Sequence, residues 1–458
     1  MIENDAFKLL LINLFHLNPD DIANIFCTTF NKMMVLIVTL ADKHQACPYC
    51  GFTAPKIKEY VTKEITHSAL TTQKCIIKYR ARRYKCSCCG KTYYEFNPFV
   101  FKSQKISILT VHNILKDLKD FNETFTSVAR RYHVSPTSVS TIFDNHVDIG
   151  RNPLPEIINF DEVYAFKSEK SKYVCVLLDF KKQIPVDVLP NRKKEYLLNY
   201  FQKIPLEERK KVKYACSDMY EVYRDVVHKV FPCSCMLLDY FHLSQDFHRK
   251  MNEVRIEVMK GYKDDKASDE YYLLKKFNWL LFKNPEDEDK YGRLFDVERE
   301  RKYNSHFKSY MNYYDLRRKL LEINNDLTIC YSLKLELVDF YSKSTIDNAQ
   351  VNLEHLICSC IDTNIEEMIA FSNNLINWKQ EIINSFTIVG TEYKVEADKG
   401  QVVVCNKKVN NAIIENRNKI IKCIKNNANG YTNWSRFRNR VMYVLDPNTT
   451  FSLEPREK

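Results

Sequence analysis

The chain has 458 residues, which at roughly 100–200 residues per domain is enough for about three domains. Hydrophobic residues make up 45% and charged residues 28%, as in a globular protein, and the net charge of +11 weakly favours a polyanionic partner. Only 8 glycines occur, and neither G-x-x-x-x-G-K-S/T nor G-x-G-x-x-G is present, which excludes the usual glycine-rich phosphate loops.

The start of the chain and its cysteines indicate the compartment. The first residues include Glu and Asp rather than a basic region before an apolar core, and the apolar run over residues 33–40 is too short to span a bilayer. We therefore expect a cytoplasmic protein. The 16 cysteines are then expected to stay reduced, with a few of them binding metal.

Two cysteine pairs near the N-terminus have the spacing of zinc ligands. They follow a predicted helix over residues 5–15 and a predicted strand over 33–40. Each C-x-x-C pair is followed by a glycine, and together they supply four thiolates for a tetrahedral Zn²⁺: Cys47, Cys50, Cys86 and Cys89. Cys88 is an alternative to Cys89 with less suitable spacing, and buried free thiols are the alternative to a metal site.

Residues 104–148 have the pattern of a helical DNA-binding unit. Apolar residues recur at three- and four-residue spacing, and the predicted helices cover residues 106–118, 125–132 and 136–146. Ser135 is the expected N-cap of the third helix, with proline at its first position. This is helix-turn-helix geometry, in which the third helix enters a major groove and exposes Thr137, Ser138 and Ser140. A plain three-helix linker is the alternative.

From residue 157 onward the order of predicted elements indicates a ribonuclease H-like mixed sheet. Three strands come first, and helices and strands then alternate: strands 157–166, 173–180 and 184–190, helix 193–204, strand 212–218, helix 219–231, strand 233–239 and helix 240–260. A meander of three strands followed by this alternation is the order expected for that fold.

Two aspartates lie on neighbouring strands of the predicted sheet. Asp161 lies inside the apolar run 157–166, and Asp218 ends the run 212–218. A carboxylate inside a buried strand is costly unless it is paired or bound to metal. The first and fourth strands are neighbours in a ribonuclease H-like sheet, so the two side chains are expected to meet at one edge.

The rest of the chain is predicted to interrupt and then complete this domain. Residues 262–385 have a helical pattern throughout and are interpreted as an insertion. Residues 386–409 resemble a β-hairpin with Asp398-Lys-Gly400 as the turn. A helix over about 411–426 and a final arginine-rich helix follow.

The helix over 411–426 carries the third acidic candidate, Glu415. Asn418, Lys419 and Lys422 lie three, four and seven residues later, on the same helix face. In a nuclease the acid would hold a metal ion, and the neighbouring amide and ammonium groups would hold phosphates. An ordinary charged helix face is the alternative.

Several of these strings are shared with a known family. They are the two cysteine pairs with Arg82-Arg-Tyr-Lys-Cys86, then Phe160-Asp-Glu162, Ser217-Asp-Met-Tyr220, Asp239-Tyr-Phe-His242, the helix from Glu415 to Lys425, Gly430-Tyr431 and Phe437-Arg-Asn-Arg440. Over almost its entire length the chain resembles the insertion-sequence transposases of the ISL-three group. One departure is Asn416, where the family usually has glycine directly after its glutamate.

The resemblance implies a DDE catalytic triad at Asp161, Asp218 and Glu415. These acids would hold two divalent ions, Mg²⁺ or Mn²⁺, for cutting and joining DNA strands. The expected partners are the terminal inverted repeats of the element and target DNA, bound by at least a dimer on the nucleoid of a bacterium. Asp239-x-x-His242 resembles a signature of related transposase groups, which orients DNA or a catalytic side chain; a structural histidine beside a helix-capping aspartate is the alternative.

The resulting fold class is multidomain α+β. The expected domains are a zinc-binding DNA-binding domain (1–100), a helix-turn-helix domain (101–150), a ribonuclease H-like core (151–261 and 386–445), an all-helical insertion (262–385) and a C-terminal tail (446–458). Arg82 and Arg83 are expected to neutralise phosphates and supply affinity, while the third helix chooses the sequence.

Two other functions are compatible with parts of the sequence. A non-catalytic DNA-binding regulator derived from a transposase explains the cysteine pairs, the three helices and the charge, but leaves three well-placed carboxylates without a role. A ribonuclease H-type RNA nuclease explains the acids but not the N-terminal DNA-binding modules. Metal-dependent nicking of a DNA end separates the transposase from the regulator, and substrate choice separates it from the RNA nuclease.

Overall fold

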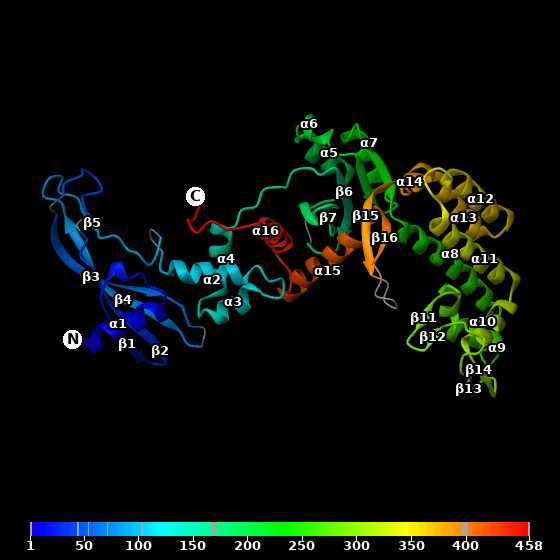
Figure 1. Cartoon of the computed structure of the whole chain (residues 1–458), viewed down its shortest axis with the longest axis horizontal. Helices are drawn as coiled ribbons and strands as arrows, with labels where there is room; N and C mark the ends of the chain where they lie inside the picture. The colour runs from blue at the N-terminus through cyan, green and yellow to red at the C-terminus, as the bar shows by residue number, and fades with distance from the viewer. Residues whose placement is uncertain are drawn as a thin grey trace.

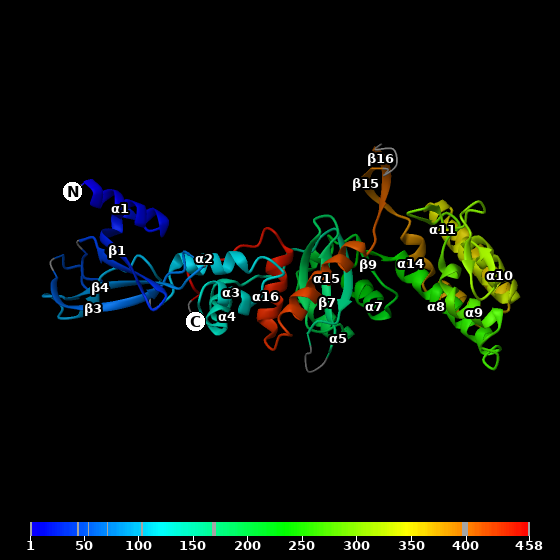
Figure 2. The ribbon, with the colours of Figure 1, turned by 90° about the horizontal axis from the view of Figure 1, so that it is seen from below.

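The computed structural model describes residues 2–43, 45–53, 55–70, 72–101, 104–166, 171–395 and 402–456. These residues form an elongated molecule with the N-terminal sheet at one end and a largely helical region at the other (Figure 1). A three-helix unit and a second sheet lie between these ends, and the perpendicular view shows the same succession (Figure 2). The chain is a mixed α and β protein with several sheets.

The N-terminal module is a five-stranded sheet with a helix packed on one face. Its elements are α1 (Ile2–Leu14), the 3-10 turn η1 (Pro19–Asp21), β1 (Ile22–Phe30), β2 (Met33–Leu40), β3 (Lys56–Thr66), β4 (Cys75–Lys85) and β5 (Thr92–Tyr94). The strand order is β1-β2-β4-β3, and β5 pairs with β4. Leu11, Ile12 and Phe15 join Leu36 and Ile77 of the sheet in one buried cluster.

Only β2 among these strands is predicted from the sequence. The longest unpredicted segments include β3, which has eleven residues. It carries charged residues and is little buried along most of its length. Its hydrophobic pattern is therefore weak. Pairing with β4 over nearly the whole strand supplies the order that local pattern does not.

The three helices expected after this module are present. They are α2 (Ile108–Asp117), α3 (Phe125–Arg131) and α4 (Pro136–His146), and each begins at a hydroxyl N-cap that accepts a backbone N–H bond. The turn between α3 and α4 contains His133, whose φ is +53°. Their shared core includes Ile114, Val128 and Phe143, together with Tyr443 from near the C-terminus.

A mixed five-stranded sheet occupies the middle of the molecule. Its strands are β6 (Ile157–Val163), β7 (Val174–Asp179), β8 (Ile184–Leu189), β9 (Tyr214–Ser217) and β10 (Cys235–Leu238), connected by α5 (Lys194–Gln202), α6 (Leu206–Arg209) and α7 (Glu221–Val230). The order is β10-β9-β6-β7-β8. β6, β7 and β8 form an antiparallel meander, whereas β6, β9 and β10 are parallel. Apart from the single-turn α6, these are the elements that the sequence predicts.

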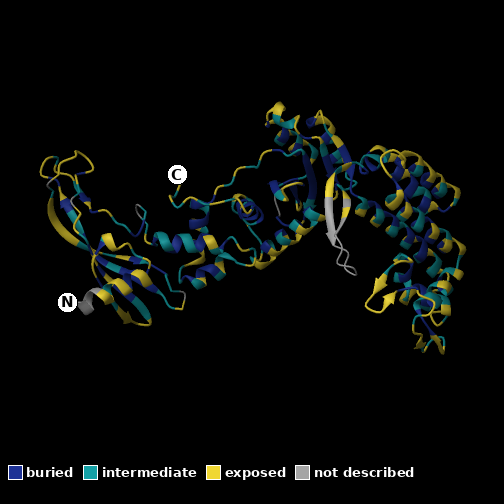
Figure 3. Ribbon diagram, viewed as in Figure 1, coloured by how far each residue is buried: buried dark blue, intermediate teal, exposed yellow. Residues whose placement is uncertain are grey.

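Helices cover both faces of this sheet, which Figure 3 shows as largely buried. In β6, Ile158 and Phe160 pack with α5 and α7. Val163 packs instead with the two final helices, α15 (Ala412–Asn427) and α16 (Trp434–Leu445). Because side chains alternate along a strand, Asp161 lies on the same face as Val163, toward α15.

The region after β10 is mostly but not entirely helical. Its helices are α8 (Tyr240–Lys260), α9 (Asp269–Lys276), η2 (Asn278–Phe282), α10 (Tyr313–Glu322), α11 (Asn325–Lys343), α12 (Ala349–Asp362), α13 (Glu366–Asn377) and α14 (Lys379–Asn384). The prediction of helix throughout 262–385 is wrong between η2 and α10. Two small hairpins occur there, formed by β11 (Glu288–Asp289) with β12 (Gly292–Arg293), and by β13 (Lys302–Asn304) with β14 (Ser309–Met311). Pro285 and Gly292, whose φ is +97°, disfavour a continuous helix.

A β-hairpin leads from this region back to the central sheet. β15 (Ile388–Val395) and β16 (Val402–Lys408) pair antiparallel, as the sequence predicts. The predicted turn Asp398-Lys-Gly400 lies outside the described residues. Figure 2 shows the hairpin standing out from the rest of the ribbon. α15 follows directly, and Asn416 lies inside it with helical geometry, so this position needs no glycine.

Candidate functional site

Asp161 and Asp218 are brought together by the parallel pairing of β6 with β9. Asn159 lies opposite Cys216 in this register. Extending the register by two residues places Asp161 level with Asp218, the residue directly after β9. The two carboxylates interact, since the charge of Asp218 helps to raise the pKa of Asp161. The two aspartates therefore lie close together on neighbouring strands, as the order of elements predicts.

Asp161 is buried and held in a fixed orientation. Its Oδ1 accepts a bond of 2.7 Å from the backbone N–H of Glu162, and its Oδ2 accepts a bond of 2.8 Å from Nδ2 of Asn418. Burial is the main cause that raises the pKa of Asp161 to about 7, and the charges of Asp218 and Glu415 add to it. A carboxylate in this setting gains strongly from a bound cation.

Asp218 is also largely buried, and burial raises the pKa of its carboxyl group above the ordinary value. Arg192 and His242 act in the opposite direction because positive charge favours the carboxylate. The buried Oδ1 of Asp218 takes part in no hydrogen bond. This atom is therefore free to accept a ligand.

Glu415 reaches the site from the first turn of α15, whose start is fixed by two buried asparagines. Nδ2 of Asn159 in β6 donates to Oδ1 of Asn411 at 2.7 Å and to the carbonyl of Asn410 at 2.8 Å. Nδ2 of Asn411 donates back to the carbonyl of Phe160 at 3.3 Å. These bonds tie the beginning of α15 to the strand that carries Asp161.

Asp239 and His242 lie in the same cluster. Nε2 of His242 is 3.9 Å from Oδ2 of Asp239 and 3.9 Å from Oε1 of Glu415. Asp239 occupies the N-cap position of α8, but its side chain makes no capping hydrogen bond. It accepts a bond of 3.4 Å from the backbone N–H of Asn411 instead. Burial raises the pKa of its carboxyl group, whereas the backbone N–H groups of Asn411 and of Phe241 at the start of α8 act in the opposite direction.

The donor atoms of this cluster suit a divalent cation. In the described part of the chain, the ligand atoms of Asp239, His242 and Glu415 all lie within 4.8 Å of one another. Asp161 and Asp218 lie beside this group but are not part of it. Oδ2 of Asp239 and Nε2 of His242 are buried and make no hydrogen bond. Carboxylate oxygens with one imidazole nitrogen fit Mg²⁺ or Mn²⁺.

The predicted phosphate ligands on α15 separate into two groups. Asn418 is buried and donates to Asp161, so its expected contact with phosphate is corrected to a contact within the site. The reason is the helix period, which turns Asn418 toward β6 together with Ile414 and Ile421. Lys419 and Lys422 are exposed and remain available to DNA.

A second compact group is formed by the four N-terminal cysteines. The Sγ atoms of Cys47 and Cys89 are 3.7 Å apart, and those of Cys50 and Cys86 are 3.5 Å apart. Four sulfurs at about 2.3 Å from one Zn²⁺ would lie about 3.8 Å from each other, so the group is compatible with zinc. Cys88 is exposed and lies outside the group, which leaves Cys89 as the fourth member.

The glycines after both cysteine pairs adopt the left-handed conformation that the turns require. Gly51 and Gly90 have φ values of +74° and +71°. Their N–H groups donate to the carbonyls of Cys47 and Cys86 and close the two turns. Backbone N–H groups of the second turn lower the pKa of Cys86 to about 7, which favours the thiolate.

The two arginines of β4 have different surroundings. Arg82 is largely buried, donates to Glu95 at 2.8 Å and to the carbonyl of Leu40 at 3.1 Å, and so holds the module together. Arg83 is more exposed and pairs with Glu59 at 2.7 Å. Of the two, only Arg83 is placed to reach a phosphate.

The start of α4 is accessible. Thr137 is exposed, and Ser138 and Ser140 are half-buried. The hydroxyl of Ser138 is 2.8 Å from that of Ser135, and Ser140 donates to the carbonyl of Thr137. Thr137 is therefore the least constrained of the three predicted base contacts.

Three residues that position the site are not identified from the sequence. Asn159 and Asn411 fix the position of α15. Arg192 forms an ion pair with Glu162, the residue after Asp161, and its guanidinium lies 4.8 Å from the ring centre of Tyr220. The available signal is the single polar residue in the apolar run Ile157-Ile-Asn-Phe160. A buried polar side chain in a strand needs a partner, but the sequence does not show which one.

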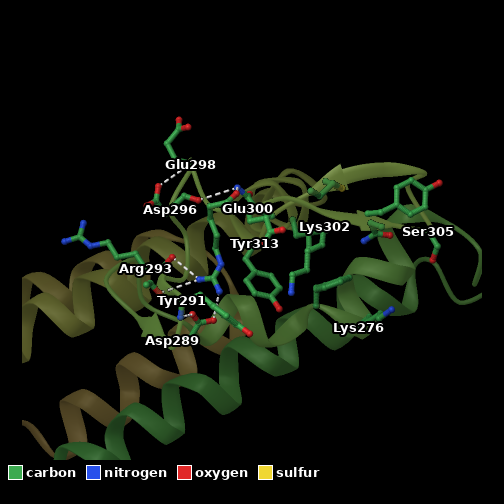
Figure 4. A pocket seen from close by; sticks show the side chains of 18 of the residues that line it. Lys276, Asp289, Tyr291, Arg293, Asp296, Glu298, Glu300, Lys302, Ser305 and Tyr313 are labelled. Carbon is green, nitrogen blue, oxygen red and sulfur yellow. Dashed lines mark hydrogen bonds and ion pairs between the residues drawn. The ribbon is translucent and has the colours of Figure 1, made fainter. Parts of the chain in front are cut away.

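A cavity of about 750 Å³ lies elsewhere, between the two small hairpins and α10. Figure 4 shows its lining of mixed charge, with Lys276 and Lys302 beside Asp289 and Glu300. None of the predicted site residues lines it.

Comparison with known proteins gives the family. Residues 158–397, just over half of the chain, match the model of a family described as transposase, the DDE type of the ISL3 group. The chain belongs to this transposase family. It is also similar to the transposase of insertion sequence element IS1001 from Bordetella parapertussis, with 20% identity over 409 residues, covering 89% of this chain and 90% of the relative.

These comparisons confirm the resemblance seen in the sequence. The matched segment of the transposase contains Asp161, Asp218, Asp239 and His242, whereas Glu415 lies beyond it. The place of Glu415 in the site therefore depends on geometry. Within the described ranges, no helix of this transposase combines the length and apolar character needed to cross a membrane.

Proposed function

We propose that this transposase cuts DNA at the ends of its insertion sequence and joins the freed ends to target DNA, with Asp161, Asp218 and Glu415 as catalytic carboxylates. The supporting observation is the convergence of these acids from β6, the end of β9 and the first turn of α15. The strand order, a meander followed by parallel strands, supports the proposed ribonuclease H-like core.

Each part of the site has a distinct task in this mechanism. Two divalent ions, Mg²⁺ or Mn²⁺, would activate a water and later a DNA 3′-hydroxyl for in-line attack and stabilise the leaving oxygen. Asp161 and Asp218 offer buried oxygens for these ions, and Asn418 keeps Asp161 in place. Lys419 and Lys422, exposed on the same helix, are suited to hold phosphates.

DNA recognition is assigned to the N-terminal half. α2, α3 and α4 would act as a helix-turn-helix, with Thr137, Ser138 and Ser140 meeting base edges in a major groove. The four cysteines would hold a structural Zn²⁺ that stabilises the first module. Arg83 would add phosphate affinity from β4.

Transposition needs two DNA ends in one complex, so we expect at least a dimer that assembles on DNA in the bacterial cytoplasm. The helical insertion, residues 262–385, is the proposed site of contact between copies. The domain boundaries predicted from the sequence stand as part of this proposal. One addition is that the three-helix unit shares its core with Tyr443 of α16.

The test is cleavage of a labelled duplex that carries one terminal repeat of the element joined to flanking DNA. The full-length chain should nick the duplex at the element boundary in Mg²⁺ or Mn²⁺ and not in a chelator. Asp218→Asn, checked for folding by circular dichroism, should not nick it. Binding without metal-dependent nicking would support a regulator instead, and preferential cleavage of an RNA–DNA hybrid would support an RNA nuclease.

A further inference from the structure

We propose that Asp239, His242 and Glu415 form one metal-binding subsite of their own, with His242 as a direct nitrogen ligand, beside a second subsite formed by Asp161 and Asp218. The inference deepens the proposed function and rests on it, because Glu415 is shared with the catalytic carboxylates. It gives the Asp239-x-x-His242 string a chemical role within the carboxylate cluster.

The three ligand atoms approach one point from three different parts of the fold. Asp239 follows β10, His242 lies in the first turn of α8, and Glu415 lies in the first turn of α15. The two measured separations, from Nε2 of His242 to each carboxylate, are both 3.9 Å. Ligands about 2.0–2.2 Å from a shared ion lie about 3.0–3.6 Å apart, so these two separations would shorten by about 0.3–0.9 Å on binding. The third pair, Asp239 and Glu415, lies within 4.8 Å.

The hydrogen bonding of these atoms also points to a ligand. Oδ2 of Asp239 and Nε2 of His242 are buried and without a hydrogen-bond partner, and the side chain of Asp239 is only 5% exposed. A separation of 3.9 Å is too long for the two to satisfy each other directly. A buried carboxylate oxygen left unpaired is costly, and a cation between the three groups would remove that cost.

The donor set determines which cation fits best. Two carboxylates and one imidazole make a mixed oxygen and nitrogen site, which suits Mn²⁺ better than Mg²⁺ or Ca²⁺ because the latter prefer oxygen alone. The four cysteines form a thiolate site that suits Zn²⁺. Mn²⁺ therefore probes the subsite without competition from the cysteine group.

The experiment measures Mn²⁺ bound to the zinc-loaded full-length chain by electron spin echo spectroscopy, which detects a directly bonded imidazole nitrogen. The wild-type chain should show nitrogen coupling. His242→Asn should lose it and weaken Mn²⁺ binding on the order of 10–100-fold, at least the loss seen for outer-shell changes. His248→Asn is the matched control, since His248 is equally half-buried on α8 but lies against Phe282, and it should keep the signal.

Two further variants complete the design. Asp239→Asn should weaken Mn²⁺ binding to a similar extent, whereas Asp218→Asn should retain the nitrogen coupling because its ligand belongs to the other subsite. Thermal unfolding of each variant establishes that it is folded before binding is measured. The proposal is overturned by Mn²⁺ without nitrogen coupling in the wild type, by coupling that survives His242→Asn, or by no Mn²⁺ binding at concentrations that support cleavage.

These outcomes separate the subsite from the proposed function. DNA cleavage without nitrogen coupling would support the catalytic assignment and contradict the proposed subsite. Nitrogen coupling in a chain that cleaves no DNA would support the subsite and contradict the assignment as a nuclease. Both measurements are made on the same preparation.

Discussion

At the scale of single residues, the site concentrates buried carboxylates that the fold does not neutralise. Burial is the largest cause of the raised pKa of Asp161, Asp218 and Asp239 alike. Asp161 accepts hydrogen bonds from the backbone N–H of Glu162 and from the amide of Asn418, while the positive charges of His242 and Arg192 favour the carboxylate form of Asp218. Function therefore opposes stability here, and bound cations are expected to stabilise the folded chain.

The first prediction is that Asp161, Asp218 and Glu415 act as one unit. Asp161→Asn, Asp218→Asn and Glu415→Gln should each remove nearly all cleavage, and double variants should be little worse than single ones, because the reaction needs both metal subsites at once. Asp218→Asn should also raise the thermal stability of the metal-free protein by about 1 kcal/mol, since it removes a buried charge. Substantial nicking by Asp218→Asn in Mg²⁺ would rule the assignment out.

The second prediction concerns Asn418. Asn418→Ala removes the 2.8 Å bond to Asp161 and should lower the cleavage rate on the order of 10–100-fold, as for other groups that orient metal ligands. DNA affinity measured by gel shift should stay the same. Lys422→Ala is the matched control on the same helix, and it should weaken DNA binding instead. If Asn418→Ala weakens DNA binding and Lys422→Ala lowers only the cleavage rate, Asn418 is a phosphate ligand, as the sequence alone predicts.

At the scale of elements, the N-terminal module depends on a small number of strong constraints. Among the described residues, the buried cluster next to the cysteines contains Tyr84 and Tyr93 besides Cys47 and Cys86, with Cys89 packed against it. Long β3 is mostly exposed. The larger core of the module lies around Leu36 and Ile77, away from the cysteines. At the cysteine end, a bound metal and the Arg82–Glu95 pair are therefore expected to contribute much of the order.

The third prediction is that zinc and the folding of this module are linked. The chain should contain one Zn²⁺, and Cys86→Ser should lose it and unfold the module, seen as loss of protection from hydrogen exchange over β3 and β4. Cys88→Ser, two residues away and exposed, should keep both zinc and protection. Purified protein without zinc would contradict this prediction.

The fourth prediction separates the two arginines of β4. Arg82→Ala leaves buried Glu95 without its partner and should destabilise the module by about 3 kcal/mol. Arg83→Ala should leave stability nearly unchanged, weaken binding to all DNA sequences and reduce the salt slope by about one. Chemical denaturation and gel shifts over a range of salt measure the two effects. If both variants lose DNA affinity equally and neither is destabilised, Arg82 contacts phosphates, as the sequence alone predicts.

At the scale of the whole molecule, the three-helix unit α2–α4 is joined to the central sheet through α16. The hydroxyl of Tyr443 donates to the carbonyl of Leu115 at 2.9 Å, and Arg436 pairs with Asp144 at 2.6 Å. The fully buried Arg440 donates to the carbonyl of Asp120 at 2.8 Å. A fragment that ends at the last residue of α4 would lose these partners, so recognition is better tested in the full chain.

The fifth prediction is that binding and chemistry are separable by point changes. Asp218→Asn should still shift terminal-repeat DNA in a gel, whereas Cys86→Ser should not. Thr137→Ala should alter which sequence is preferred, by about 1–3 kcal/mol at the contacted base pair, because the start of a recognition helix meets base edges. A Thr137 variant with unchanged preference would move recognition to another surface.

Local pattern determined much of this protein before any tertiary contact was considered. The elements from β6 to α8 apart from α6, the three helices with the Ser135 cap, the cysteine cluster, and the aspartates within β6 and directly after β9 all follow from periodicity, capping and spacing, which act over a few residues. The family also followed from such strings. The sequence did not predict the N-terminal strands β1, β3, β4 and β5, of which β3 has its pattern masked by charge. It also missed the hairpins between η2 and α10, where turn residues outweigh helical spacing.

Tertiary structure decided which side chains meet. Glu415 and His242 are 173 positions apart in the chain, and they lie together because Asn159 and Asn411 fix the start of α15 against β6. The same packing turned Asn418 inward to Asp161 and paired Arg82 with Glu95. Partner choice depends on distances between elements that are remote in sequence, and neither residue type nor spacing along one element contains that information.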